Sequence, residues 1–202
     1  QAGKTTQLAS ERKEYVALSE ITDELKSWFA NNQSQLGYIT ISGSGEPTLN
    51  NKIGELIARI KGITRTPVAV ITNASLLHDP AVRQEIKEAD LIVPSLDAAA
   101  PKAFQAIDRP VHGVEIEEII QGLVELRREF KGKIWLEVML VKGVNDDLRY
   151  IKKLKEAAER INPDIIQLNS PVRSPGISGI SPVDKGKLKK IKEILGDKCQ
   201  IL

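Results

Sequence analysis

Short apolar runs alternate with amphipathic stretches along most of this chain of 202 residues, and this alternation constrains the fold more than any other feature. The runs are rich in β-branched and aliphatic residues, as expected for strands buried on both faces of a sheet. They lie at Tyr38–Ser42, Val68–Thr72, Leu91–Pro94, Ile134–Val141 and Ile165–Leu168. Strands that alternate with helices predict an α/β fold, and we expect a partial (β/α)6-type, TIM-like barrel with parallel strands.

The segments between these runs carry apolar residues at helical spacing. Helices are expected around residues 21–29, 53–60, 116–130 and 148–158, followed by a basic helix near 184–195. The pairs Asp79-Pro80 and Ser181-Pro182 each place a capping side chain before a proline, which predicts that a helix begins at each pair. The residues Cys199–Leu202 are compatible with a further strand or with disorder.

The first predicted element is a helix near Ser19, which follows a polar stretch at residues 5–17. In a series of β/α units each crossover helix connects two parallel strands, so a strand is expected before this helix. Without that strand, the one at Tyr38 has an unprotected edge. We therefore expect a single domain over residues 1–202 whose first strand is missing, with a loop at 1–17 and a loop and helix at 176–202.

Composition excludes several classes of protein. Lys plus Arg number 29 and Asp plus Glu 27, so the balance gives no overall footprint for nucleic acid. No apolar run is long enough to span a bilayer, which predicts no membrane partner. A single cysteine fits a reducing compartment, so a cytoplasmic location is expected. The single cysteine, Cys199, can form no intrachain disulfide and cannot supply a cysteine set for a metal cluster. The spacing of His, Cys and Asp also predicts no metal site within this chain.

Polar and small residues follow each predicted strand. Gly43–Thr48 follows the first, Asn73 the second, Ser95 and Asp97 the third, and Asn169–Arg173 the fifth. In β/α barrels the carboxyl ends of the strands carry the chemistry, so we expect these residues to share one rim. Each group has a plainer interpretation as well, because glycine, asparagine, serine and aspartate are common in turns.

Glu137 is harder to explain as a turn or surface residue. It lies within the apolar strand sequence Trp-Leu-Glu-Val-Met at residues 135–139. Carboxylates are rarely buried without a partner, so its place in a strand predicts a functional side chain that faces the barrel interior.

Taken together, these segments resemble the radical S-adenosylmethionine (SAM) superfamily. Gly43–Pro47 resembles its Gly-Gly-Glu-Pro motif, with Ser44 in place of the first glycine of that motif. Thr72–Ala74 and Ser95–Ala98 resemble the following strand ends, with Ala74 in place of a glycine. Three further segments resemble one subgroup, the Fe–S oxidoreductases similar to wybutosine-synthesis proteins: 106–110, 136–146 and 169–173.

This resemblance implies a binding site for SAM. The glycine-containing loop is expected to bind the methionine ammonium, strand ends to face ribose and carboxylate, and the segment at 136–146 to cover adenine. The implied cofactor-binding residues are Gly43, Ser44, Gly45, Glu46, Pro47, Asn73, Ser95, Asp97, Glu137, Val141, Asn169 and Arg173.

The resemblance further implies a [4Fe–4S] cluster whose ligands lie outside this chain. Gln1–Thr6 resembles the stretch after a Cys-x3-Cys-x2-Cys motif, so we expect the chain to start just after the cluster loop and to be inactive alone. The implied activity is reductive cleavage of SAM to a 5′-deoxyadenosyl radical that abstracts hydrogen from a substrate. An electron donor such as a flavodoxin or ferredoxin is expected, and the substrate (tRNA, peptide or small molecule) stays open.

Two other interpretations remain at this point. The chain can be a non-radical barrel lyase that uses Lys142 or Glu137 at its rim. It can also be a degenerate barrel that binds SAM, another nucleotide or a partner protein.

Overall fold

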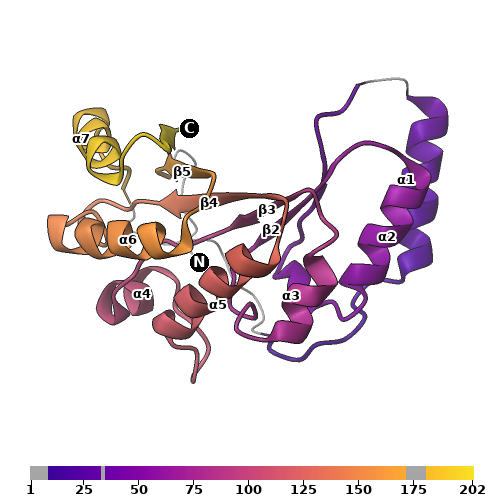
Figure 1. The fold of residues 1–202 in the computed structure, drawn as a ribbon, viewed down its shortest axis with the longest axis horizontal. Coiled ribbons are helices and arrows are strands. Elements are labelled where there is room, and N and C mark those ends of the chain that lie inside the picture. The colour runs from indigo at the N-terminus through magenta and orange to yellow at the C-terminus, as the bar shows by residue number, and fades with distance from the viewer. Residues whose placement is uncertain (1–8, 33–34, 172–180) are drawn as a thin grey trace.

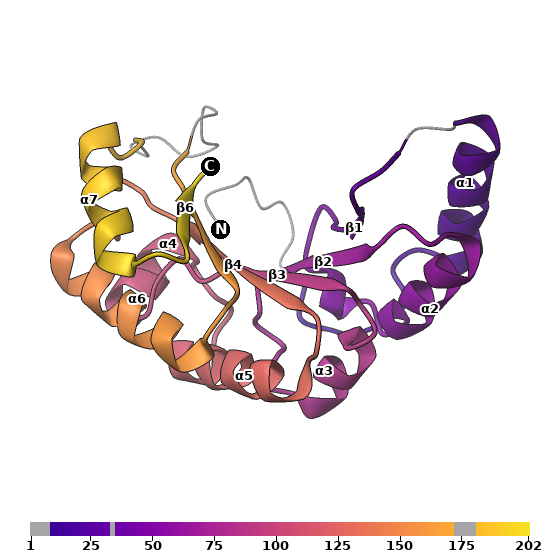
Figure 2. The ribbon, with the colours of Figure 1, turned by 45° about the horizontal axis from the view of Figure 1, so that its top comes forward.

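The computed structural model describes residues 9–32, 35–171 and 181–202. Within these ranges six parallel strands form one sheet in the order β1-β2-β3-β4-β5-β6, which is also their order in the chain. The sheet curves into an open trough that does not close into a full barrel (Figure 2). Its strands are β1 (Ile39–Ile41), β2 (Val68–Thr72), β3 (Leu91–Pro94), β4 (Lys133–Met139), β5 (Ile165–Asn169) and β6 (Cys199–Ile201).

The helices cover the convex side of this trough (Figures 1 and 2). A short 3-10 helix, η1 (Pro47–Leu49), follows β1. The α-helices are α1 (Leu18–Asn31), α2 (Ile53–Ile63), α3 (Pro80–Ile86), α4 (Pro101–Ile107), α5 (Ile116–Glu129), α6 (Leu148–Ile161) and α7 (Lys185–Leu195). This arrangement confirms the predicted parallel α/β fold of a partial barrel.

Strand β4 shows how the sequence separates the two faces of the sheet. Ile134, Leu136 and Val138 are fully buried, and they belong to the main core between sheet and helices. Trp135 and Glu137, which alternate with them, are only partly buried. Because successive side chains of a strand point to opposite faces, Glu137 lies on the concave side of the trough.

Caps and close packing fix where the helices begin and how they approach the loops. The Asp79 side chain accepts a hydrogen bond from Ala81 N at 2.8 Å, which confirms the expected start of α3. Helix α5 approaches the turn after β2 so closely that a Cβ at Gly122 would lie 2.5 Å from the carbonyl carbon of Leu77. Only glycine permits this contact, and through it α5 supports the loop at the end of β2.

Three local expectations need correction, and one helix was not predicted. No helix begins at Ser181-Pro182; Pro182 forms an isolated bridge with Val141, and α7 begins at Lys185 with Asp184 as its cap. The first strand is shorter than predicted, and the fourth ends at Met139 rather than at residue 141. Helix α4 was not expected, since its seven residues are too few to show a period. Of the two alternatives left open for the final residues, the structure shows the strand, β6.

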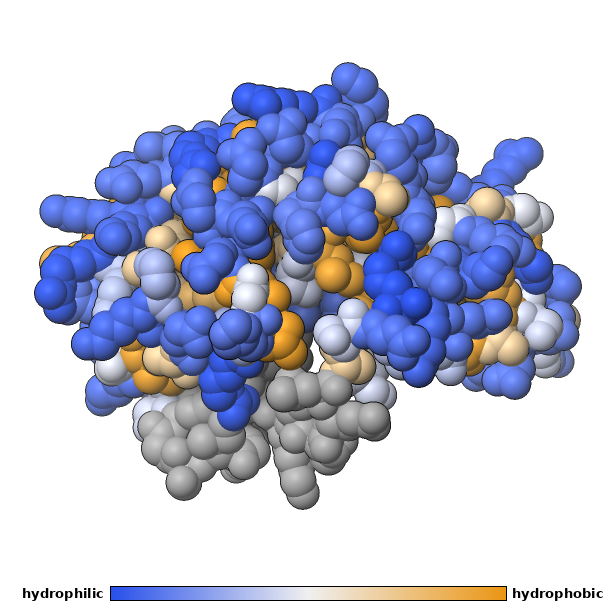
Figure 3. All heavy atoms as spheres, turned by 90° about the horizontal axis from the view of Figure 1, so that it is seen from below, coloured by the Kyte–Doolittle hydropathy of each residue, from blue (hydrophilic) through white to orange (hydrophobic). Residues whose placement is uncertain are grey.

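The outward faces of the helices are polar, and hydrophilic side chains dominate the face seen in Figure 3. Across the described ranges, none of the helices combines the length and the apolar character that crossing a bilayer requires. In the same ranges no strand comes before α1; Lys13 forms only an isolated parallel bridge with Asn50.

Candidate cofactor-binding site

The carboxylate of Glu46 joins the loop after β1 to the end of β2. Its Oε1 accepts hydrogen bonds from the hydroxyls of Thr48 and Thr72, at 2.6 Å each, and from Thr48 N at 3.1 Å. Its Oε2 accepts a hydrogen bond from Asn73 N at 2.6 Å. A carboxylate that accepts four hydrogen bonds is held firmly in one position. Glu46 therefore anchors the Gly43–Pro47 loop to β2.

The loop that Glu46 anchors is open to solvent. Residues 42–45 are exposed, and a Cβ placed on Gly45 would meet no heavy atom within 4 Å. Backbone carbonyls in such a loop can accept hydrogen bonds from an ammonium group. The negative charge of Glu46 favours a cation beside them, although its oxygens already serve protein donors. The Glu46 side chain is therefore an anchor, and the backbone carbonyls are the groups of this loop that are available to a cation.

The turn after β2 explains two residues of the predicted motif. Asn73 Oδ1 accepts a hydrogen bond from Ser75 N at 3.0 Å, so this side chain closes a turn. Ala74 is fully buried and has a φ of 63°, in the left-handed region that glycine occupies more readily. Its N–H donates to Thr72 Oγ1 at 3.0 Å. A glycine at position 74 would therefore suit the backbone better than the alanine present.

Three side chains form a row across the ends of β3, β4 and β5. Asn169 Nδ2 donates to Glu137 Oε1 at 2.9 Å, and the hydroxyl of Ser95 donates to Glu137 Oε2 at 3.4 Å. The row lies on the concave side, and its members are partly exposed. Asn169 Oδ1 is buried and has no hydrogen-bond partner within the described part of the chain. The row can therefore accept hydrogen bonds from hydroxyl or amino groups of a ligand.

Asp97 lies in the wall of the barrel behind this row. It is 8% exposed, and its Oδ1 accepts a hydrogen bond from Met139 N at 2.8 Å. Burial raises the pKa of Asp97 to about 8, and the nearby charge of Asp108 adds to this rise. Burial likewise raises the pKa of Asp108 to about 6. Asp97 thus joins the end of β3 to β4, and its side chain is directed into the wall.

Asn145 supports the same wall from the loop after β4. Its Nδ2 donates to the carbonyl oxygens of Asp97 and Met139, at 2.7 and 2.8 Å, and its Oδ1 accepts from Val141 N at 2.7 Å. Asn145 is 2% exposed, so loss of these hydrogen-bond partners would destabilise the folded protein. The loop that the resemblance assigns to adenine, including the buried Val141, is therefore held in one conformation.

The structure brings most of the predicted residues to one edge of the sheet. The Gly43–Pro47 loop, Asn73, Ser95, Glu137 and Asn169 all lie at or after the carboxyl ends of strands β1 to β5. Arg173 lies outside the described residues. Thr48 and Asn145 were not predicted to be supporting residues. The sequence features that could have identified them are a threonine two residues after Glu46 and an asparagine in a turn that contains glycine.

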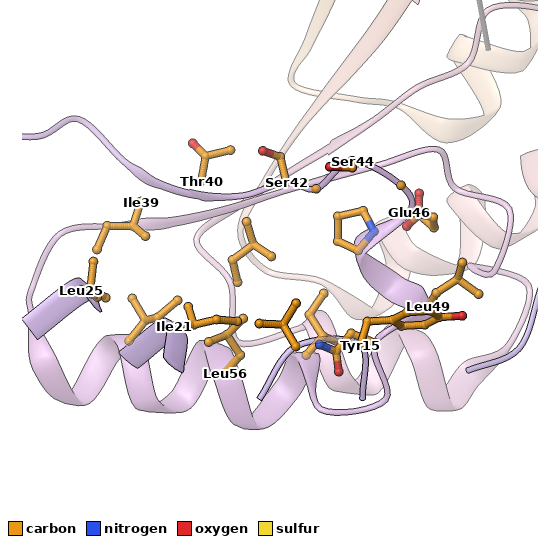
Figure 4. Close-up of a pocket in the computed structure, with 18 of the residues that line it drawn as sticks. Tyr15, Ile21, Leu25, Ile39, Thr40, Ser42, Ser44, Glu46, Leu49 and Leu56 are labelled. Atoms are coloured by element: carbon orange, nitrogen blue, oxygen red, sulfur yellow. The ribbon is translucent and has the colours of Figure 1, made fainter. Parts of the chain in front are cut away.

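A separate cavity of about 770 Å³ lies beside the Gly43–Pro47 loop, between β1 and helices α1 and α2. Figure 4 shows Ile39 facing Leu25 across it, whereas Thr40 projects from the other side of the strand. Apolar side chains of the two helices and of β1 line it together with the segment Ser42–Pro47, and Ile21, Leu25 and Leu56 lie on the helix side of β1. This cavity is therefore distinct in chemistry from the polar row on the concave face.

The sequence model of the radical SAM superfamily matches residues 9–158. The chain therefore belongs to the radical SAM superfamily. The proposed likeness to wybutosine-synthesis proteins within it stays a prediction.

Two curated relatives show how the chain compares in length. It is 38% identical over 187 residues to "GTPase Obg" of Brachyspira hyodysenteriae, covering 93% of this chain and 27% of the relative. It is 35% identical over 175 residues to "UPF0026 protein slr1464" of Synechocystis, covering 86% of this chain and 63% of the relative. The chain thus spans less than two thirds of the length of either.

Solved structures share the fold at low sequence identity. A domain of pyruvate-formate lyase-activating enzyme from Bacteroides vulgatus has a TM-score of 0.64 and 22% identity, covering 82% of this chain and 99% of that domain. Streptococcus suis SuiB bound to S-adenosylmethionine has a TM-score of 0.68 and 16% identity, covering 98% of this chain and 44% of SuiB. These likenesses show the fold.

The radical SAM superfamily implies two bound groups, SAM and an iron–sulfur cluster. The residues of this chain fit these two groups to different degrees. The polar row with the unpartnered Asn169 Oδ1 and the open glycine loop fit a ligand with hydroxyl, amino and ammonium groups, as SAM has. An iron–sulfur cluster needs several thiolates, whereas the sequence has one cysteine, Cys199, buried in β6. In the described ranges no three His, Cys, Asp or Glu side chains are placed to hold a metal ion. These residues do not fit a cluster.

Proposed function

We propose that this chain is the SAM-binding barrel of a radical SAM enzyme. The observation that carries the proposal is the row of Ser95, Glu137 and Asn169, which presents acceptors at the carboxyl ends of three adjacent strands. Membership of the superfamily and the position of the Gly43–Pro47 loop at the same edge support it.

Each part of the site has a task that its chemistry suits. The backbone carbonyls of Gly43, Ser44 and Gly45 accept hydrogen bonds from the methionine ammonium, and Glu46 keeps the loop in place. Glu137 and Asn169 accept hydrogen bonds from ribose hydroxyls or the adenine amino group, and Val141 packs against the base. These contacts orient the ligand and keep water from it, which is what catalysis by a bound cofactor requires of the protein.

A reduced [4Fe–4S] cluster, held elsewhere in the complete protein, would supply the electron for reductive cleavage of SAM to methionine and a 5′-deoxyadenosyl radical. In this proposal the cluster ligands belong to a part of the complete protein outside the described residues. A flavodoxin or ferredoxin provides the electron, and the substrate yields a hydrogen atom. The chain of 202 residues alone is therefore expected to be inactive.

The test uses the complete protein with its natural flanking sequence, reconstituted anaerobically with iron and sulfide. Formation of 5′-deoxyadenosine from SAM is measured after addition of dithionite. We expect product with the complete protein and none with residues 1–202 alone. Product from residues 1–202 would overturn the assignment of the cluster ligands. Turnover of a candidate substrate without iron or reductant would favour a non-radical lyase and overturn the proposal.

A further inference from the structure

We infer that Lys187, on helix α7, is a positioning residue for the β4–α6 loop, residues 140–146, which lies between strand β4 and helix α6. This loop carries Val141, which the proposed function places against the adenine base. The effect of Lys187 on ligand binding rests on that proposed function, whereas its effect on the shape of the loop does not. The inference starts from the buried carboxylate of Asp146.

Asp146 uses both of its carboxylate oxygens to close the loop. Oδ1 accepts a hydrogen bond from Gly143 N at 2.8 Å, and Oδ2 accepts one from Lys187 Nζ at 2.6 Å. The Asp146 side chain is only 6% exposed. A carboxylate buried to this extent is unfavourable unless a cation neutralises it. Within the described ranges Lys187 is the one cation that pairs with Asp146, so Lys187 supplies this charge.

The hydrogen bond from Gly143 to Asp146 fixes the outer part of the loop. Gly143 is exposed to solvent and has a left-handed φ of 74°. Val144 N donates to the carbonyl oxygen of Val141 at 3.1 Å, so residues 141–144 form a turn. Glycine has wide conformational freedom, and the shape of this turn therefore depends on the bond between Gly143 and Asp146.

The backbone that leads into α7 lies alongside the loop. Lys142 N donates to the carbonyl oxygen of Ser181 at 3.0 Å, and Pro182 forms an antiparallel bridge with Val141. Helix α7 then begins at once, with Asp184 as its cap. The start of α7 is therefore fixed relative to the β4–α6 loop by backbone contacts.

Lys187 lies in the first turn of α7. Its backbone N–H donates to Asp184 Oδ1 at 2.9 Å, which orients the beginning of its side chain toward the loop, and its ammonium group then reaches Asp146. Lys187 thus transmits the position of the helix to a residue 41 positions earlier in the chain.

The other lysines of α7 have different surroundings. They are exposed, and within the part of the chain that the structure describes none of them forms an ion pair; they are Lys185, Lys189, Lys190 and Lys192. A run of lysines on a surface helix is ordinarily a solvated face, and these four fit that description. Lys187 differs from them because it is partly buried and pairs with a buried carboxylate.

Removal of the Lys187 ammonium leaves Asp146 with a buried charge and no cation. The carboxylate then turns toward solvent or takes up a proton, and either change weakens its hydrogen bond with Gly143. The turn loosens, and Val141 is no longer held in place for a ligand. The Gly43–Pro47 loop keeps its own anchor at Glu46, so the effect is confined to the β4–α6 loop.

Amide hydrogen exchange in the complete protein tests the inference without any ligand. Lys187→Met keeps the apolar stem and removes the charge, so we expect exchange at Gly143 to be about tenfold faster than in the wild type. Lys187→Arg, which keeps the charge, and Lys190→Met, which removes an exposed charge from the same helix, should exchange as the wild type does. Equal exchange at Gly143 in Lys187→Met and the wild type would overturn the inference.

Two comparisons separate a charge effect on the loop from a general loss of stability. Ile39 N, which donates to Pro67 in a distant strand, is the internal reference, and equal acceleration at Ile39 and Gly143 would overturn the inference. The double variant Asp146→Asn/Lys187→Met needs no cation, and its asparagine can still accept from Gly143 N. We expect exchange at Gly143 to return to within about threefold of the wild type. Exchange as fast as in Lys187→Met would show that Lys187 acts through packing alone and would contradict the inference.

Calorimetric titration of SAM into the same proteins connects the loop to the proposed function. We expect Lys187→Met to bind SAM about tenfold more weakly than the wild type, and the double variant to regain most of the affinity. Faster exchange at Gly143 with unchanged SAM affinity would overturn the role of Lys187 in binding. If the wild type binds no SAM, the proposed function fails, whereas exchange at Gly143 still decides whether Lys187 positions the loop.

Discussion

Arg12 and Glu85 form a two-pronged ion pair that ties the segment before α1 to helix α3. Nη1 of Arg12 donates to Glu85 Oε1 at 3.2 Å, and Nη2 donates to Oε2. Nε of the same guanidinium donates to the carbonyl oxygen of Thr48 at 2.9 Å. The Thr48 hydroxyl in turn donates to Glu46, so Thr48 links Arg12 to the Gly43–Pro47 loop.

This connection predicts that Arg12 positions the Gly43–Pro47 loop. The pair is about three quarters buried, so Arg12→Met should lower the free energy of unfolding by about 1–2 kcal/mol in urea. The variant should also weaken SAM binding without touching the ligand. The matched control is Arg59→Met, which removes an exposed pair with Glu55 and should cost about 0.5 kcal/mol or less. Equal losses from both variants would show that Arg12 is an ordinary surface residue.

Glu46→Gln tests the anchor itself. The carboxylate accepts from four donors, and an amide would turn an NH₂ group toward some of them. We expect a loss of about 2–3 kcal/mol in unfolding free energy, because buried donors are left without acceptors. We also expect at least about tenfold weaker SAM binding, since the loop moves. Glu55→Gln on the exposed face of α2 is the control, and calorimetry with urea unfolding gives both quantities.

The raised pKa of Asp97 predicts that the free energy of unfolding falls as pH rises. Burial, with the charge of Asp108, raises its pKa to about 8 in the folded protein, against about 3.9 for an unfolded chain. Below pH 4 the Asp97 carboxyl is protonated in both the folded and the unfolded protein. Between about pH 4 and 8 it is protonated only in the folded protein, so the free energy of unfolding falls by up to about 1.4 kcal/mol per pH unit. Asp108, with a pKa of about 6, adds to the slope only below that pH.

The measurement is urea unfolding at pH 6 and pH 8 for the wild type and for Asp97→Asn. The asparagine can still accept the hydrogen bond from Met139 N, so it keeps the contact and removes the titration. We expect the wild type to lose stability over this interval and the variant to lose much less. Parallel slopes for the two proteins would contradict a buried, proton-binding Asp97.

Ala74→Gly tests the strained turn after β2. The left-handed φ of 63° costs about 1–2 kcal/mol for a residue with a Cβ, which offsets the loss of its buried methyl group. We expect the substitution to change the unfolding free energy by less than about 0.5 kcal/mol, whereas Ala98→Gly, at a buried alanine without a positive φ, should cost about 1 kcal/mol. Equal losses at both positions would show that position 74 carries no strain.

The spacing of apolar residues predicted the strands and the side of the sheet on which Glu137 lies, because burial of one or both faces of a strand produces a regular pattern of apolar residues. The basic helix expected near 184–195 is α7, whereas the helix start expected at Ser181-Pro182 was wrong. That pair fits a capping pattern, but Pro182 pairs with Val141 and Asp184 caps the helix. Contacts such as Arg12 with Glu85 join residues 73 positions apart, and no local pattern encodes them.

The placement of the predicted residues at one edge of the sheet was predictable for a similar reason. The motif around Gly43 and the polar strand ends are local signals, and parallel strands bring them to one edge. The directions of the side chains are not local: Asp97 turns into the wall toward Met139, and Glu46 is taken up by Thr48, Thr72 and Asn73. These partners come from other strands, so the sequence alone could not distinguish anchors from ligand contacts.

The most direct test of the central claim is calorimetric titration of SAM into the complete protein and its Glu137→Gln variant. Glu137 accepts hydrogen bonds from Ser95 and Asn169 and faces the concave side, so we expect SAM binding by the wild type and binding at least about tenfold weaker by the variant. Glu156→Gln, at an exposed position on α6, should bind as the wild type does. No binding by the wild type, or equal affinity in all three proteins, would contradict the assignment of this site.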